Sequence, residues 1–278
     1  MTDTDEGHPT AGHGRGGMTA RRTKQTREEL RQLLLDSGRA ILQEEGLGHG
    51  AESLTFKRVF DRVQRERGLR LTNASVIKRV WVNQADFQAD VLASIASDDS
   101  RAEIEDTVTA VASFLGQVDL SSAESRWMSL SELCRVAGVA NVEALERSPN
   151  WTTWIGVWAL ATAGDPYVYR ARIEAALVAG YEEFTERFVE LYAGVAHRLG
   201  FRLSEGLTLR QFAIAAESLA EGCALRKRVD GSDMSGIVRA TGPDGAPREW
   251  TLFAVGLEAL ALQFFELVPE GSDGSDDA

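Results

Sequence analysis

A short polar and basic helix face between residues 73 and 81 carries the side chains best suited to chemistry with a partner. Ser75, Lys78 and Arg79 share this face of a helix that we expect to begin at Asn73, while apolar side chains occupy the opposite face. Hydroxyl, ammonium and guanidinium groups on a short, well-braced helix can reach base edges and phosphates in the major groove of DNA. The alternative interpretation is a charged face that only meets water.

Flanking helices must hold this face in place. The first is predicted over 26–45, where leucine and isoleucine recur at steps of three and four. The second starts after Thr55, and its apolar stripe runs from Phe56 to Val63. We expect Asn83 to cap the next helix, which leads the chain away from the basic face.

Charge is distributed unevenly along the chain. The 278 residues carry a net charge of −12, which taken alone argues against a nucleic-acid partner. Residues 55–79, however, hold eight basic and two acidic side chains, whereas the part after residue 90 holds 15 basic and 29 acidic ones. A basic patch on an acidic body fits a protein that meets DNA with one end only. A solvated charged face is again the alternative.

The two ends of the sequence have the composition of disordered segments. Residues 1–25 are rich in Gly, Thr, His and Asp and end in basic side chains, while residues 270–278 are acidic. Arg21, Arg22 and Lys24 could reach phosphates or a minor groove, or they could be an ordinary solvated tail. The domains expected between these ends are a DNA-binding domain over 26–97 and a larger helical domain over 98–269.

Helical periodicity continues through nearly the whole of the larger domain. No alternating pattern typical of strands stands out, so the predicted fold class is all-α. The expected helices cover 100–117, 122–137, 140–147, 150–163, 166–199, 207–226 and 248–268, with a loop over 230–247.

Two of these helices have the apolar pattern of subunit contacts. The stripe from Leu209 to Cys223 has the spacing of paired helices, and the helix over 248–268 is apolar on two faces. A helix that is apolar on two faces is expected to be buried on both, and a second subunit could cover one of these faces. The predicted homodimer interface comprises Leu209, Phe212, Ala216, Leu219, Cys223, Phe253, Leu257, Leu260 and Phe264.

Aromatic side chains gather in two neighbouring helices of the larger domain. A pocket for an apolar or aromatic small molecule is one interpretation of this cluster, and ordinary core packing is the other. No charged pair is obvious nearby, which favours a neutral or lipophilic effector. The candidate pocket residues are Trp127, Cys134, Trp151, Trp154, Trp158, Tyr181 and Phe184.

The sequence contains no motif typical of metal binding, catalysis or phosphate binding. The four histidines do not join cysteines or acids at metal-ligand spacing, and no catalytic serine, cysteine–histidine pair or phosphate loop is recognisable. We therefore expect no enzyme, no catalytic residue, no metal and no cofactor. Cys134 and Cys223 lie in apolar helical patterns and are expected to be buried thiols. With no signal peptide and no apolar run of about 20 residues, we expect a cytoplasmic protein that does not contact the membrane.

The first helix, the Thr55-Phe56 start of the second and the segment VIKRVWVNQADF together resemble the N-terminal domain of TetR-family transcriptional regulators. Val80-Trp81 stands where that family usually has Tyr-Phe. The resemblance covers residues 27–95. It implies a three-helix helix-turn-helix domain followed by a larger helical ligand-binding and dimerisation domain. It also implies a homodimer, usually a repressor, that leaves a near-palindromic operator when a small-molecule effector binds.

The resemblance also implies roles by position. Thr55 would contact phosphate, and Ser75 and Arg79 would face bases. Lys78 and Gln84 stand where the family usually has a phosphate-binding Tyr and a phosphate-binding Lys. The full set of expected DNA contacts is Arg21, Arg22, Lys24, Thr55, Lys57, Arg70, Thr72, Asn73, Ala74, Ser75, Lys78, Arg79 and Gln84.

A second hypothesis keeps this fold but not the DNA binding. Residues 64–71, QRERGLRL, separate the two reading helices where the family has a tight turn, and Gln84 replaces a cation. These departures leave open a helical small-molecule or protein-binding module whose helix-turn-helix no longer reads DNA. Arg65, Arg67 and Arg70 in this connection could add contacts to the DNA backbone or could be solvated.

Overall fold

The computed structural model describes residues 26–48, 50–76, 79–97, 101–163, 170–240 and 245–269. These residues form helices almost throughout, with a few short strands at the ends of helices and in one hairpin. The all-α class predicted from the sequence is therefore confirmed. In the described part of the chain, every helix is too short or too polar to span a lipid bilayer.

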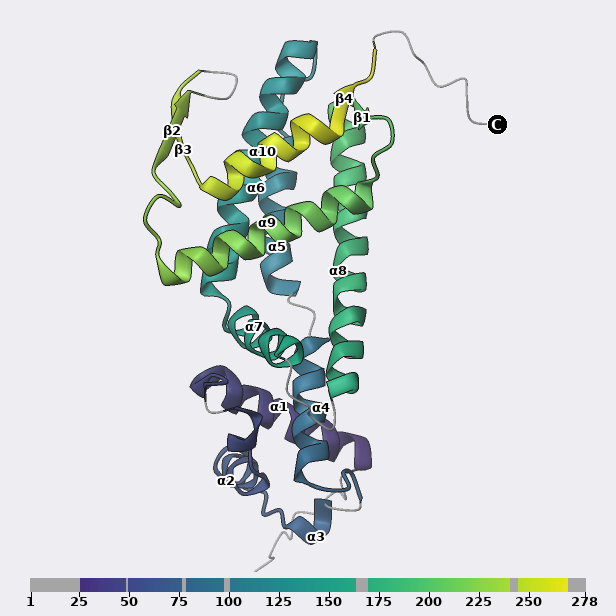
Figure 1. Ribbon diagram of the computed structural model, residues 1–278, viewed down its shortest axis with the longest axis vertical. Helices are drawn as coiled ribbons and strands as arrows, with labels where there is room; N and C mark the ends of the chain where they lie inside the picture. The colour runs from purple at the N-terminus through teal and green to yellow at the C-terminus, as the bar shows by residue number, and fades with distance from the viewer. Residues whose placement is uncertain are drawn as a thin grey trace, which may run out of the picture.

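The first four α-helices form the lower end of the molecule in Figure 1, and we refer to them together as the N-terminal module. Thr26, Thr55 and Asn83 each accept a hydrogen bond from the backbone amide three residues further on, which fixes three of the helix starts. Gly68 ends the second helix in the left-handed conformation, with φ of 66°. The elements of the module are α1 Arg27–Glu45, the 3-10 helix η1 Ala51–Ser53, α2 Phe56–Arg67, α3 Asn73–Val76 and α4 Gln84–Ala96.

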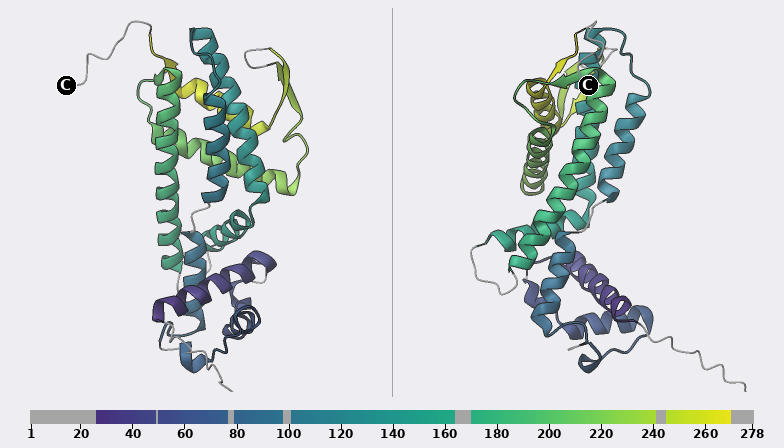
Figure 2. Two further views of the ribbon diagram at one scale, coloured as in Figure 1. Left: turned by 180° about the vertical axis from the view of Figure 1, so that it is seen from behind. Right: turned by 90° about the vertical axis from the view of Figure 1, so that its right-hand side faces the viewer.

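The remaining helices form the helical body. Long helices run along the molecule, and the last two helices cross them on one face, side by side and in opposite directions (Figures 1 and 2). Ser122, Ser148, Thr208 and Thr251 cap the starts of four of these helices. The helices are α5 Arg101–Leu115, α6 Ala123–Arg147, α7 Pro149–Thr162, α8 Arg170–Leu199, α9 Leu209–Val229 and α10 Leu252–Phe264.

The short strands of the body pair in two antiparallel ladders. Strand β1 (Phe201–Leu203) pairs with β4 (Phe265–Leu267), with Phe201 opposite Leu267. This ladder ties the end of α8 to the end of α10. Strand β2 (Ile237–Ala240) pairs with β3 (Pro247–Trp250), which corrects the loop expected over 230–247.

Other helix bounds also differ from the expected ones. The helices expected over 122–137 and 140–147 are one helix, because Gly138 continues α6 where α10 crosses it closely. A Cβ atom on Gly138 would lie 2.7 Å from the Cα of Ala254. The helix expected over 248–268 is shorter than predicted. Its first residues belong to β3 and its last residues to β4, so α10 spans Leu252–Phe264.

The buried apolar residues form two separate cores. The lower core joins α1 to α4 with Val157 and Ala161 of α7 and with Ile173 and Leu177 of α8. The upper core lies among α5, α6, α9, α10 and the second half of α8. Helix α7 and the first half of α8 therefore pack with the N-terminal module, although both follow residue 98.

Candidate functional site

Helix α3 lies at the tip of the N-terminal module, at the end of the molecule farthest from β1 and β4 (Figure 1). The sequence indicated a helix from Asn73 to Trp81, and the described helix runs from Asn73 to Val76. The amide of Val80 donates to the carbonyl of Val76 over 2.9 Å. Residues 77 and 78 lie outside the described residues. Asn73 and Arg79 are exposed at this tip.

The tip is held by a buried aromatic cluster. Trp81 packs edge-on against Phe87 at 4.8 Å between ring centroids, and Phe56 stacks on Phe87 at 4.9 Å. The indole nitrogen of Trp81 donates to Asp90 over 2.9 Å, and Arg31 of α1 binds the same carboxylate. Side chains from α1, α2 and α4 thus fix the backbone that follows α3, so its exposed face has a defined direction.

The polar groups at the start of α2 form hydrogen bonds mainly within the N-terminal module. The Thr55 hydroxyl accepts from the amide of Arg58, and the Gln84 side-chain oxygen accepts from the amide of Phe56 over 3.2 Å. A free helix N-terminus would offer these amides to a phosphate. The resemblance implied phosphate contacts for Thr55 and Gln84, and here the acceptor oxygens of both residues are occupied by α2 itself.

Acids of α1 neutralise part of the basic patch. Arg62 binds Glu44 through two hydrogen bonds of 2.7 and 2.8 Å and also pairs with Glu66, and Arg58 pairs with Glu45. The Arg62 guanidinium holds the pKa of Glu44 below its usual range. The described basic side chains that are exposed near α3 are Lys57, Arg65, Arg67, Arg70 and Arg79.

The long connection between the reading helices is shorter than the sequence suggested. Helix α2 continues to Arg67, so half of the segment QRERGLRL belongs to it, and only Gly68 to Thr72 link it to α3. Leu69 and Leu71 of this link pack against the lower core. The two arginines in the last turn of α2 suit the negative end of the helix dipole.

The predicted DNA contacts divide into three groups. Thr72, Asn73 and Arg79 are exposed around the tip, with Lys57 and Arg70 exposed nearby. Thr55 and Gln84 bond to α2, as given above. Arg21, Arg22, Lys24 and Lys78 lie outside the described residues, and of Ala74 and Ser75 the structure describes the backbone, which is part of α3.

A cavity of about 120 Å³ lies between the two cores, and we call it the inter-core cavity. The N-terminal module contributes Gln43 of α1 and Ile95 and Ala96 of α4 to its wall. The body contributes residues of α6 to α10, among them Trp154 and Tyr181, whose rings meet edge to face at 5.2 Å. The cavity therefore touches both parts of the molecule at once.

Acidic groups face the inter-core cavity. Glu217 is only 9% exposed; one carboxylate oxygen accepts from the Thr185 hydroxyl over 3.2 Å, and the other has no partner. Glu221, one helical turn further along α9, accepts from the Tyr181 hydroxyl at 3.5 Å. Burial raises the pKa of each carboxyl to about 7, and the nearby Glu221 adds to the rise at Glu217.

The cation nearest to these acids is already paired. Arg210 lowers the pKa of Glu217, but its guanidinium binds Glu182 and Glu186 at 2.6 Å each. No lysine, arginine or histidine is among the described residues that line the inter-core cavity. Its wall thus has negative groups without a matching positive one.

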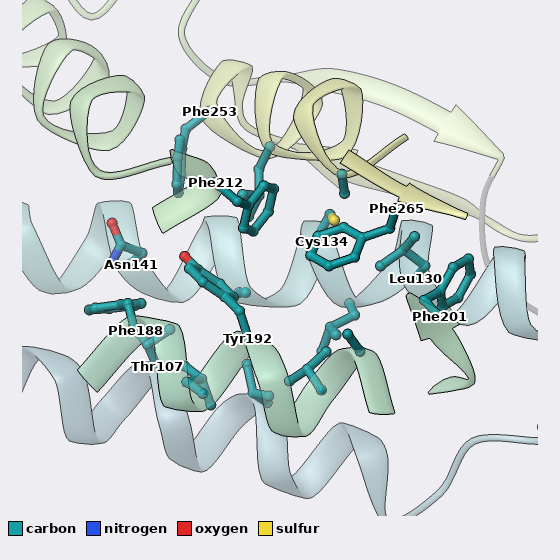
Figure 3. A pocket seen from close by; sticks show the side chains of 18 residues that line it. Thr107, Leu130, Cys134, Asn141, Phe188, Tyr192, Phe201, Phe212, Phe253 and Phe265 are labelled. Atoms are coloured by element: carbon teal, nitrogen blue, oxygen red, sulfur yellow. The ribbon is translucent and has the colours of Figure 1, made fainter. Parts of the chain in front are cut away.

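A second cavity, of about 70 Å³, lies inside the upper core, and we call it the bundle cavity (Figure 3). Its wall is almost entirely apolar, with Cys134, Phe201 and Phe265 among the lining side chains. Burial raises the pKa of the Cys134 thiol, which makes it inert. The residues that line both cavities are Asn141, Phe188, Tyr192 and Phe253.

Part of the predicted aromatic cluster lines the two cavities, and the binding of a ligand there stays a prediction. Trp151, Trp154, Tyr181 and Phe184 line the inter-core cavity, and Cys134 lines the bundle cavity. Two members need correction. Trp127 packs against Phe201 at 4.6 Å and lines neither cavity, and Trp158 is 43% exposed and also lines neither.

Sequence reasoning missed the acids of the inter-core cavity. Among the residues that the structure describes, no pair of opposite charges lines the cavity, as the sequence suggested, but its wall carries carboxyl groups. A signal was present, because Glu217 follows Ala213 by four residues and precedes Ala220 by three. It therefore occupies the inward face of an apolar helix. Asn141 was also missed. Its side-chain oxygen is buried without a partner, as is the indole nitrogen of Trp151.

The predicted dimer residues lie mostly inside their own chain. Phe212, Ala216, Cys223, Phe253 and Leu257 are buried in the upper core, and Leu209, Leu219, Leu260 and Phe264 pack partly buried against it. The apolar residues spaced three and four apart therefore form the inner faces of α9 and α10. The apolar side chains that α9 and α10 expose are Ile214, Leu225, Val229, Leu252 and Leu262.

Within the described residues, no group of three or more His, Cys, Asp or Glu side chains could hold a metal ion. Cys134 and Cys223 are both buried and free, as expected from their apolar patterns. A scan against protein-family models and a search of curated proteins found no match to this chain. The case for a function therefore depends on the geometry of α3, the two cavities and the outer face of α9 and α10.

Proposed function

We propose that this chain is a homodimeric DNA-binding transcriptional regulator of the TetR type, released from its operator by a small molecule. The observation that carries the proposal is α3, a short exposed helix at the tip of a module whose aromatic core fixes its direction. Exposed Arg70 and Arg79 beside it suit base and phosphate oxygens. Such a regulator works beside the chromosome, so the proposal includes a cytoplasmic location.

The inter-core cavity supports regulation by a ligand. A molecule in it would touch Gln43 of α1 and Ile95 of α4, which belong to the N-terminal module, and Tyr181 of α8. Helices α4 and α8 leave each other no room, since a Cβ atom on Gly180 would lie 2.6 Å from the carbonyl oxygen of Ala96. A ligand that moves α8 must therefore move α4.

A second contact between α8 and the module lies closer to α3. Arg172, near the start of α8, binds the Asp86 carboxylate at 2.9 Å. The other oxygen of Asp86 accepts from the amide of Val82 over 3.0 Å, directly after the α3 turn. Movement of α8 would thus be transmitted to the backbone that carries the reading face. The ligand would favour one orientation of the module and so shift its affinity for DNA.

The outer face of α9 and α10 supports a homodimer. Ile214, Leu225, Leu252 and Leu262 each expose 39–55% of their surface on this face. A second copy packed by twofold symmetry would bury the same side chains from both chains. Two reading heads related by that axis would fit a near-palindromic operator with half-sites about 34 Å apart. These outward residues, and not the inward stripe predicted from the sequence, form the proposed interface.

The test is a gel shift with DNA from upstream of the gene that encodes this chain. Arg79→Ala is expected to lower the affinity at least about fivefold, because an arginine contact to a base or phosphate is worth about 1–3 kcal/mol. Arg202→Ala is the matched control, since Arg202 lies on β1 at the opposite end of the molecule and pairs with Glu266. Equal affinity for the two variants and the unmodified protein would refute the assignment of α3 as the reading helix.

A second candidate function is a ligand-binding or protein-binding module that does not read DNA. It is favoured by the internal bonds of Thr55 and Gln84 at the start of α2 and by the pairing of Arg62 with Glu44. Both features leave less positive charge and fewer hydrogen-bond donors available to bind phosphate. This candidate predicts no sequence-specific footprint and no steep loss of binding with added salt, whereas the regulator predicts both.

A further inference from the structure

Three of the described residues that line the inter-core cavity each have one buried polar atom without a hydrogen-bond partner. These atoms are Glu217 Oε1, Trp151 Nε1 and Asn141 Oδ1. Glu217 and Trp151 are 9% and 7% exposed, so bulk water does not replace the missing partners. A buried polar group without a hydrogen bond costs about 1–3 kcal/mol. Three such atoms in one wall indicate a space shaped around a polar ligand.

The chemistry of the wall selects the charge of that ligand. Two of the three unpartnered atoms, Glu217 Oε1 and Asn141 Oδ1, are acceptors, and Glu221 adds a second carboxyl one turn away. Trp151, Trp154 and Tyr181 supply aromatic surfaces beside these acceptors. Acceptors together with aromatic faces are the groups that bind an organic ammonium ion.

We propose that the inter-core cavity binds a small organic cation, a single aromatic ring bearing a short alkylammonium group, with Glu217 and Glu221 as its counter-charges. This inference deepens the proposed regulatory function, on which it rests for its biological role. It replaces the lipophilic effector suggested by the sequence. The ammonium group donates to the carboxylates and to Asn141, and the ring lies among Trp151, Trp154 and Tyr181.

The size of the cavity limits the ligand. A cavity of about 150 Å³ holds one benzene ring, and the inter-core cavity has about 120 Å³. A larger ligand would have to open the way into the bundle cavity past Phe188 and Tyr192, which line both spaces. A one-ring amine is close to this limit, so it would need only small side-chain movements in the wall and no entry into the bundle cavity.

The raised pKa values of Glu217 and Glu221 agree with this occupant. Without a cation, burial favours the protonated carboxyls, and both pKa values lie at about 7. An ammonium ion held between them favours the ionised forms, so its binding releases protons. The other charged or titratable groups around the pair are Tyr181, Tyr192, Glu183, which binds Arg187, and Arg210, which is held by Glu182 and Glu186.

The test measures binding to the free protein by tryptophan fluorescence and calorimetry at pH 7.5, with no DNA present. Three probes of similar shape are compared: benzylammonium, the neutral ethylbenzene and the anion benzoate. Benzylammonium is expected to bind at least tenfold more tightly than the other two. Ethylbenzene binding as tightly as benzylammonium, preferential binding of benzoate, or no measurable binding of benzylammonium would each overturn the proposal.

Matched variants test whether the cation binds in the inter-core cavity. Glu217→Gln and Glu221→Gln are each expected to weaken benzylammonium binding at least tenfold and to leave ethylbenzene binding unchanged. Glu190→Gln on α8 is the control, because Glu190 is exposed and lines neither cavity. A thermal melt checks that each variant is folded. Unchanged affinity in both cavity variants would overturn the proposal, while failure of the gel shift would leave it intact and refute only DNA binding.

Discussion

In the N-terminal module the indole N–H of buried Trp81 donates to Asp90, whereas in the helical body the indole N–H of buried Trp151 has no hydrogen-bond partner. The same difference holds between the partly buried Asp90 and the buried Glu217. Asp90 accepts from Trp81 and Arg31, but Glu217 leaves one oxygen unpaired. Among the described residues, every buried side-chain nitrogen or oxygen without a partner lies beyond residue 128. Under the proposed function, the module that presents the reading face satisfies its own polar groups, and the body that binds the ligand keeps some unsatisfied.

The largest expected contrast comes from the same substitution at the two tryptophans. Trp81→Phe removes a hydrogen bond to a carboxylate and should lower the free energy of unfolding by about 2–3 kcal/mol. Trp151→Phe removes an N–H group that has no partner, so the lost packing is offset and the change should stay below about 1 kcal/mol. Urea unfolding of both variants measures the difference. Equal losses would break the contrast between the two regions.

A smaller contrast is expected when atoms are added to each region. Gly38→Ala in α1 should cost about 1–2 kcal/mol, because the new Cβ would lie 2.8 Å from Val91 in a filled core. Ala220→Leu extends into the inter-core cavity and should change the free energy of unfolding by less than about 1 kcal/mol. The same variant should abolish benzylammonium binding. A severe loss of stability in Ala220→Leu would mean that the cavity cannot accept a ligand without strain.

The smallest expected effect concerns pH. The pKa of Glu217 lies at about 7 in the folded chain against an ordinary value of 4.5, so the folded chain binds the extra proton between these values. The stability gained from that proton is complete below pH 4.5 and is lost as the pH rises through 7. Glu217→Gln should remove this loss and be about 1 kcal/mol more stable than the unmodified protein at pH 8. Thermal melts at pH 5 and pH 8 measure the difference, and an identical pH slope in the variant would contradict the buried, unpaired state of Glu217.

Local signals in the sequence predicted most of the helices. The caps at Asn83 and Thr208 and the stripes of α1, α2 and α8 depend on neighbours within a few residues of one another, so periodicity and capping rules suffice. The expected break after residue 137 failed because Gly138 serves a crossing with α10, more than 100 residues away in the sequence. The α2–α3 link was overestimated because an arginine-rich last turn has no apolar residue to mark it as helical.

The sequence by itself determined the fold class, the aromatic cluster at Trp151 and Trp154, and the basic segment around α3. Only the tertiary structure decided which face of each amphipathic helix packs against the rest of its own chain. Periodicity shows that a face is buried but not which partner buries it. The tertiary structure placed Phe212 and Phe253 in the core and left Ile214 and Leu262 outside. It also placed Glu217 in the wall of one cavity with Trp151 and Tyr181, and this meeting of three helices puts a buried acid at the centre of the proposed ligand site.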